Sequence, residues 1–178
     1  MQTRSGDFEV TTDELRAVAG YALACAEPAL VIFRKASPDD PRPASALDAA
    51  RVFAEGAPRS RLQRTAAADA HRAAKEAPTE AAGHAASAAG DAAAAAYLHP
   101  LARATQVRHI LGAAAHAARA AELAAGDDRA VGAAHVAEAA RRATPAVVNV
   151  LSRYPSAPDG GGRVGELIRL LDATLRRQ

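Results

Sequence analysis

The stretch TEAAGHAASAAGDAAAAAYLHP, residues 79–100, decides the fold together with LARATQVRHILGAAAHAARAAELAA, residues 101–125. Alanine is the strongest helix former because it loses no side-chain entropy in a helix. Thr79 can cap one helix that runs to about Leu98, Pro100 can open a second, and Gly126 can end that one. The corner between the two helices is short, which predicts that they are antiparallel neighbours.

The rest of the chain has the same composition. Of 178 residues, 52 are Ala, and aromatic residues make up only 3%. A sheet would lack the β-branched and aromatic residues that it needs. Because each small side chain buries little area, many helices must pack together, and a homodimer is one way to bury more surface. The sequence predicts an all-α fold, a compact multi-helix bundle of about seven or eight alanine-rich helices that form a single domain over residues 1–178.

Prolines and glycines divide the remaining sequence into further helices. Thr11 and Glu14 have the spacing of a capping box, which predicts the start of the first one. The expected helices span residues 12–36 with a break at Pro28, 43–56, 59–77, 129–143, 145–154 and 164–177. We expect residues 1–10 to be frayed and residues 155–163 to form a flexible loop before the last helix.

Charge and cysteine content restrict the cellular context. The net charge of +2 gives no bulk attraction to nucleic acid, so no nucleic-acid partner is expected. The 20 Arg against 2 Lys are typical of a high-GC, actinobacterial genome. The single cysteine, Cys25, is expected to be a core residue of a cytoplasmic protein. The start of the chain is too polar for a signal peptide, and its longest alanine run is too short to span a membrane.

The usual enzyme signatures are missing. The sequence has no phosphate-binding loop, no HExxH, no paired CxxC and no nucleophile elbow. Gly160–Gly162 precede a helix, but no strand leads into them, so they are interpreted as a linker. No cofactor is predicted, the catalytic residues stay unknown, and the balance is against an enzyme.

Two stripes of polar residues are the main candidate site. They share the spacing i, i+4, i+7 and i+11, which places each stripe on one helix face: Glu80, His84, Ser87 and Asp91, then Thr105, His109, Gly112 and His116. One interpretation is a groove between two helices that supports acid–base chemistry or binds a ligand. The other is a pair of ordinary solvated faces. No metal site is predicted, since His109 and His116 are about 10 Å apart along a helix axis.

The connector Asp39-Asp40-Pro41-Arg42-Pro43 is the second candidate. Its two carboxylates and its guanidinium lie on a rigid segment, which suits contact with a partner protein. The alternative role is structural, with Asp40 leading into a helix whose first turn contains Pro43.

Three segments together resemble a known family. They are PDDPRPASALDAARVFAEG (38–56), AAGHAASAAGDAAAAAYLHPLARATQVRHILGAAAHAARAAEL (81–123) and PAVVNVLSRYPSAP (145–158). The chain resembles the Imm-5-like immunity proteins of actinobacteria from about Leu15 to Leu175. The matching positions are Asp39, Asp40, Arg42, His84, His99, Thr105, Gln106, His109 and His116. Some members carry an exonuclease name, but the clustered carboxylates and the phosphate loop of such an enzyme are missing here.

Two functions follow as hypotheses. The resemblance implies an all-helical protein that binds and neutralises a toxin-like protein of a bacterial conflict system, and it carries over no catalytic residue. The alternative is a small helical enzyme or ligand-binding protein of secondary metabolism that uses the groove around His84, Asp91, His109 and His116. Convergence of the three histidines in an enclosed cavity would favour this alternative, and histidines that spread into solvent would contradict it.

Overall fold

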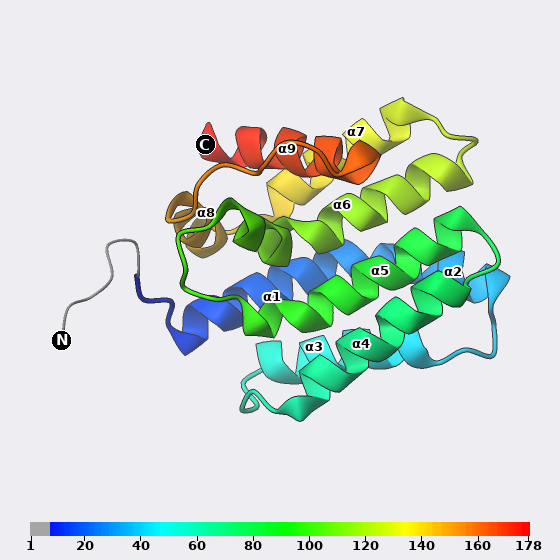
Figure 1. Cartoon of the computed structure of the whole chain (residues 1–178), viewed down its shortest axis with the longest axis horizontal. Helices are drawn as coiled ribbons and strands as arrows, with labels where there is room; N and C mark the ends of the chain where they lie inside the picture. The colour runs from blue at the N-terminus through cyan, green and yellow to red at the C-terminus, as the bar shows by residue number, and fades with distance from the viewer. Residues whose placement is uncertain (1–7) are drawn as a thin grey trace.

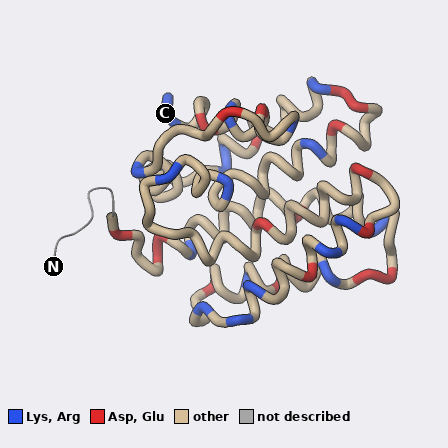
Figure 2. The backbone as a smooth tube through the Cα atoms, in the orientation of Figure 1, with Lys and Arg blue, Asp and Glu red and all other residues tan. Residues whose placement is uncertain are grey.

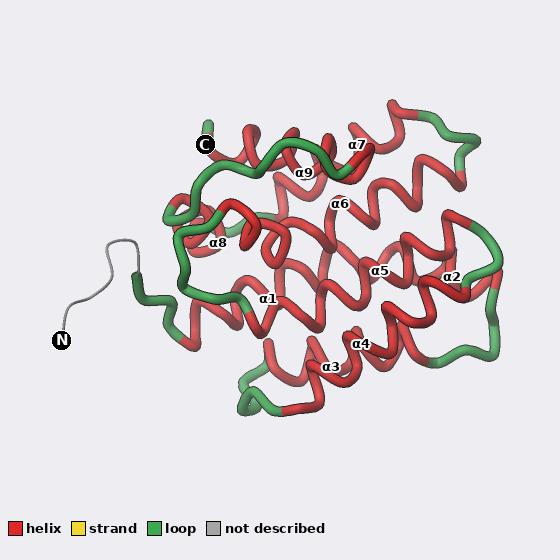
Figure 3. The backbone as a smooth tube through the Cα atoms, viewed as in Figure 1, coloured by secondary structure: helices red, strands yellow, loops and turns green. Residues whose placement is uncertain are grey.

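Helices α5 (Glu80–Ala94) and α6 (Val107–Ala124) lie side by side and antiparallel at the centre of the molecule (Figure 1). This computed structural model describes residues 8–178. The other α-helices are α1 (Thr12–Ala26), α2 (Leu30–Ala36), α3 (Arg42–Ala54), α4 (Arg61–Glu76), α7 (Arg129–Arg142), α8 (Pro145–Ser152) and α9 (Gly162–Arg176). Short 3₁₀ turns cover Glu27–Ala29, Ala95–Tyr97 and Ala104–Gln106. The described part of the chain contains no strand (Figure 3), which confirms the predicted all-α bundle.

The remaining helices pack around this central pair. Helices α3 and α4 lie beyond α5, while α7 and α9 lie beyond α6 (Figure 1). Helix α1 runs behind both central helices and also contacts α3 and α8. Most of the buried apolar residues are alanines, so the helix backbones approach closely. Larger buried side chains, such as Phe33, Phe53, Leu111 and Leu171, fill the remaining volume between the helices.

Several helix starts follow the local signals of the sequence. Thr11 and Glu14 form the predicted capping box at α1, and Thr79 caps α5 by accepting a hydrogen bond from the backbone N–H of Ala82. Pro28 lies in the 3₁₀ turn that separates α1 from α2, as expected for a proline inside a helical pattern. When α1 and α2 are taken as the one broken helix of the prediction, residues 8–178 contain eight α-helical segments, in agreement with the expected seven or eight.

The predicted helix start at Pro100 was wrong. Pro100 does not open a helix, and α6 begins only at Val107. The backbone N–H of His99 donates to the side-chain oxygen of Gln106, and the Tyr154 hydroxyl donates to the carbonyl oxygen of His99. These two hydrogen bonds hold residues 98–103 in an irregular corner, which places Thr105 on a 3₁₀ turn before the helix.

Two predictions about mobile segments stay open. Residues 1–7 of the expected frayed terminus lie outside the described residues, while Glu9 accepts a hydrogen bond from Arg153 through its carbonyl oxygen. In the expected loop 155–163, the N–H of Ala157 donates to Asp172, and Arg169 donates to the carbonyl oxygen of Gly160. These contacts tether the loop to α9.

One segment is long and apolar enough to cross a membrane by length and composition alone. It is Thr12–Ala36, and 44% of its most apolar window is buried inside the bundle. The 3₁₀ turn at Pro28 interrupts it, and α1 packs against α3, α5 and α6. A core helix of a helical bundle has the same properties.

Candidate functional site

A groove of about 880 Å³ opens to solvent between α4, α5 and α6. Both predicted stripes border it, which settles that they face each other across one seam. Its polar lining residues are His71, Lys75, Thr79, Glu80, His84, Ser87, Asp91, Thr105, Arg108, His109 and His116. Four of the six histidines of the chain therefore converge on one surface depression.

Two glycines allow the polar side chains to lie close to the helix backbones. A Cβ atom on Gly112 would be 2.6 Å from Oδ2 of Asp91, so the missing side chain on α6 leaves room for this carboxylate. In the same way, a Cβ atom on Gly90 would be 2.8 Å from the imidazole ring of His71. The side chain of Asp91 keeps 20% of its surface exposed.

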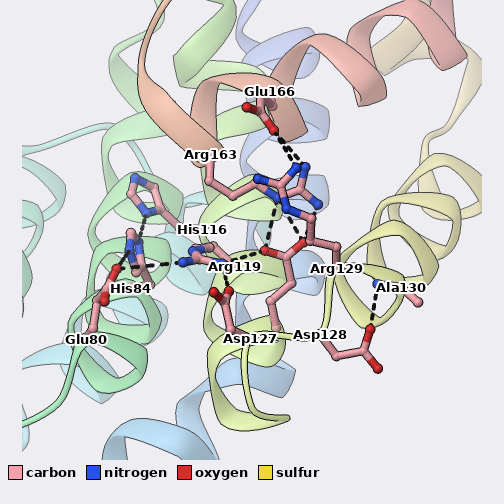
Figure 4. A network of polar contacts seen from close by, with 11 residues as sticks. Glu80, His84, His116, Arg119, Asp127, Asp128, Arg129, Ala130, Arg163 and Glu166 are labelled. Atoms are coloured by element: carbon pink, nitrogen blue, oxygen red, sulfur yellow. Dashed lines mark hydrogen bonds and ion pairs between the residues drawn. The ribbon is translucent and has the colours of Figure 1, made fainter.

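His84 and His116 form a direct pair between α5 and α6. Their Nδ1 atoms are 2.9 Å apart, and the stacked rings have centroids separated by 5.1 Å (Figure 4). In such a contact one Nδ1 donates a proton and the other accepts it, so the tautomer of one ring determines that of its neighbour. The pair thus holds one proton between two nitrogens.

Asp91 lies between two of the histidines. Its carboxylate oxygens are 3.4 Å from Nε2 of His71 and 3.7 Å from Nε2 of His116. Burial raises the pKa of Asp91 to about 7, although the positive charge of Arg108 opposes this shift. Burial also lowers the pKa of His116 to about 3, and repulsion from His84 adds to that effect. Burial therefore disfavours charge on both partners, and near neutral pH a proton can be gained or lost at Asp91.

The other histidines of the groove follow the same rule. Burial lowers the pKa of His71, of His84 and of His109. For His109 the neighbouring His99 adds a repulsive contribution. Neutral imidazoles can accept or donate protons, so the groove has the composition of an acid–base or ligand-binding site.

An ion cluster around one buried carboxylate lies beside the groove on the side of α9. Nε2 of His84 is 3.7 Å from Glu80, which in turn lies 3.9 Å from Arg119 (Figure 4). Arg119 and Arg163 both bind the fully buried Glu122, at 2.9 Å and 3.1 Å. Burial alone raises the pKa of Glu122, but the hydrogen bonds from Arg163 and Arg119 outweigh it, so this pKa lies below its ordinary value.

The structure brings together five of the nine predicted site residues. They line the groove together: His84, Asp91, Thr105, His109 and His116. His99 does not line it, because its backbone is held by Gln106 and Tyr154 in the corner before α6.

The connector residues border a separate pocket of about 560 Å³. Arg42 binds Asp40 at 2.7 Å and Glu76 at 2.6 Å, so these ion pairs tie the start of α3 to the end of α4. Asp40 also accepts a hydrogen bond from the backbone N–H of Arg42. These contacts fit the structural role, in which Asp40 leads into the helix. Asp39 is exposed and lines the edge of the pocket.

Sequence reasoning missed three groove residues. His71 and Lys75 lie on α4, and Arg108 lies on α6. The spacing i, i+4 places His71 and Lys75 on one helix face just before Pro78. This pattern is visible in the sequence, but it does not indicate which helix α4 packs against. Figure 2 shows positive and negative residues interspersed over the molecule, so the charge pattern gave no direction either.

Among residues 8–178, no group of three or more His, Cys, Asp or Glu side chains is arranged to hold a metal ion. Cys25 is buried, and burial raises the pKa of its thiol to about 11, which is the environment of a core cysteine.

Comparison with known proteins gives one result. A family model described as Imm-5 like putative immunity protein matches residues 9–146, which is more than half of the chain. The match includes the whole histidine groove and the connector pocket. No curated protein and no solved structure matches the chain. The chain therefore belongs to the Imm-5 like family of immunity proteins.

Proposed function

We propose that this protein is a cytoplasmic immunity protein that binds and neutralises a toxin of a bacterial conflict system. The observation that carries the proposal is the family match over residues 9–146. A tightly packed helical bundle also suits this role, because a rigid surface loses little conformational entropy when it binds a partner.

The test uses the genes that flank this one. Each neighbouring product is expressed alone and together with the full chain in a bacterial host. We expect one of them to arrest growth alone, to lose that effect with this protein, and to form a complex with it during size-exclusion chromatography. Neighbours that are all harmless, or toxicity that persists beside the soluble protein, would contradict the proposal.

A second candidate function is a small helical enzyme or a small-molecule-binding protein. The specific observation in its favour is that His84, His109 and His116 line one groove, in which Asp91 lies near His71 and His116. This groove is open to solvent and is not an enclosed cavity. A mixed set of neutral imidazoles and a carboxyl group with a raised pKa is typical of acid–base and ligand sites. Such a ligand would change the chemical environment of the paired imidazoles first.

The test for this candidate is the ring resonances of His84 and His116 in nuclear magnetic resonance spectra during titration with a small-molecule library. His135, which is exposed on α7, is the internal reference. Compounds that shift only the two groove histidines would support the ligand site. If no compound shifts them, the candidate is wrong.

The homodimer stays a prediction as well. Sedimentation velocity of the purified chain at several concentrations distinguishes a monomer from a dimer directly. A dimer of this size would need about 800 Å² of buried surface on each partner to be stable.

A further inference from the structure

A second cavity adjoins the histidine groove. It has a volume of about 400 Å³ and is more enclosed than the groove. His84, Thr105, Arg108 and His116 line both spaces, so the two cavities meet at these side chains. The opposite wall is mainly apolar and comes from the loop before α9 and from α9 itself, with Pro158, Val164 and Ile168. The junction thus presents polar groups on one side and apolar groups on the other.

Arg108 is a charged residue at this junction that has no ion-pair partner among the residues that the structure describes. No hydrogen bond or ion pair connects its guanidinium to any other residue that the structure describes, whereas Arg119 and Arg163 are both paired with Glu122. A guanidinium presents several N–H donors in a planar fork, which matches the two oxygens of a carboxylate. An unpaired guanidinium in the wall of a cavity therefore favours a ligand with that group.

The histidine pair adds further hydrogen-bonding atoms. Because the two Nδ1 atoms contact each other, the Nε2 atom of each ring remains. These Nε2 atoms are 3.7 Å from Glu80 and 3.7 Å from Asp91, which is longer than a hydrogen bond. Within residues 8–178 neither Nε2 atom makes a hydrogen bond of ordinary length. Because one Nδ1 donates and the other accepts, one Nε2 carries a proton that it can donate and the other can only accept.

The negative groups near the junction limit the charge of the ligand. Asp159 lines the smaller cavity, and Glu80 lines the groove. These carboxylates repel a doubly charged phosphate more strongly than a singly charged carboxylate. The apolar wall excludes a small, fully hydrated ion and favours a hydrocarbon body.

We propose that this junction binds a small organic acid, with one carboxylate and a short apolar body. Arg108 pairs with the carboxylate. The Thr105 hydroxyl and the single Nε2–H of the His84–His116 pair, on the ring whose Nδ1 accepts, donate to it, and Val164 and Ile168 contact the apolar body. This inference rests on the ligand-binding candidate described above and names its substrate class. It does not depend on toxin binding.

The experiment titrates the full-length protein with three probes: 3-methylbutanoate, its neutral amide 3-methylbutanamide, and inorganic phosphate. The readouts are the ring resonances of His84 and His116 and the affinity from the titration curve. For so small a ligand we expect 3-methylbutanoate to bind with an affinity of about 1 mM. The amide and phosphate are expected to bind at least about tenfold more weakly, because the charge-assisted hydrogen bonds to Arg108 are lost or opposed.

Matched arginine variants assign the contact. Arg108→Gln is expected to weaken binding of 3-methylbutanoate about tenfold or more, while Arg103→Gln, which changes an exposed residue that lines neither cavity, keeps the wild-type affinity. Both side chains are exposed, so both variants are expected to fold, and circular dichroism checks this.

Each contrary result has a distinct meaning. Equal binding of acid and amide, or no effect of Arg108→Gln, overturns the carboxylate inference alone. If none of the probes and no library compound shifts the groove histidines, the ligand-binding candidate fails with it. Toxin protection by Arg108→Gln is measured separately in the growth assay, so neither failure is confused with failure of the immunity proposal.

Discussion

At the scale of single residues, the burial of His116 makes the stability of the folded protein depend on pH. Its imidazole is mostly buried, with 14% of its side-chain surface exposed, and burial lowers its pKa to about 3. In the unfolded chain the same ring has a pKa near 6.5. The folded pKa lies below the unfolded one, so between these values the unfolded state binds more protons, and stability is lost as the pH falls from 6.5 toward 3.

The prediction concerns His116→Gln. One such histidine contributes about 2 kcal/mol of acid destabilisation at pH 5. Asp91 opposes it: its folded pKa of about 7 lies above the ordinary 3.8, so its contribution increases stability as the pH falls from 7 to 4. Because Asp91 is present in both proteins, its contribution cancels in the comparison. We therefore expect wild type to lose about 2 kcal/mol more than His116→Gln between pH 7 and pH 5.

Urea unfolding at the two pH values measures this difference. The control is His135→Gln, which changes an exposed residue on α7 and is expected to follow wild type. Identical pH dependence in wild type and His116→Gln would show that the imidazole is not buried in its neutral form.

The sequence located two walls of the groove but not the third. His84 and Asp91 share a face of α5, and His109 and His116 share a face of α6, as helical spacing requires. His71 could not be included, because its approach depends on the missing side chain of Gly90 and on which helix α4 packs against. A one-dimensional pattern contains no information about that pairing.

At the scale of helices, the contact between α6 and α7 depends on one glycine. Gly132 on α7 faces the buried carboxylate of Glu122, and a Cβ atom there would be 1.9 Å from Oε1. Arg119 and Arg163 hold Glu122 in place, so its side chain has little freedom to move away. Helices α6 and α7 can therefore approach each other closely around Glu122 only because residue 132 has no side chain.

The corresponding prediction compares two glycine substitutions within helices. Gly132→Ala is expected to destabilise the protein by about 2 kcal/mol or more, because it overpacks the Glu122 cluster. Gly20→Ala, on α1, places its Cβ atom at an ordinary 3.8 Å from Ala54 and is expected to stabilise by up to about 1 kcal/mol, since alanine is the better helix former. Thermal unfolding of both variants measures the contrast, and a shift in the same direction for both would contradict it.

At the scale of the whole molecule, the core extends beyond the part that matches the family model. The match ends at residue 146, yet α8 and α9 place their apolar side chains in the same core cluster as α1, α5 and α6. Among them, Val150, Leu151, Leu167 and Leu171 are fully buried. Helices α8 and α9 are therefore expected to be required for folding.

Truncation tests this expectation and the prediction of a single domain. Loss of one buried leucine side chain costs about 2–5 kcal/mol, and a domain has only about 5–15 kcal/mol of stability in total. A chain that ends at residue 146 is therefore expected to be unfolded or aggregated by circular dichroism and size-exclusion chromatography. Truncation after Arg176, which removes only two exposed residues, is expected to keep the wild-type melting temperature. A folded, cooperative 1–146 fragment would show that the last two helices are an addition to an independent domain.

The amino-acid sequence by itself determined the helical class, most helix boundaries and the two polar stripes. These properties follow from alanine content, from proline and glycine positions and from the 3.6-residue period, all of which act within about one turn of chain. Only the tertiary structure decided that Pro100 lies in a corner held by Gln106 and Tyr154, and that α4 closes the groove. Those outcomes depend on contacts between residues far apart in sequence. Because most helix faces in this chain consist of alanine, many ways of pairing the helices are similar in packing, and the glycines and buried charges favour one of them.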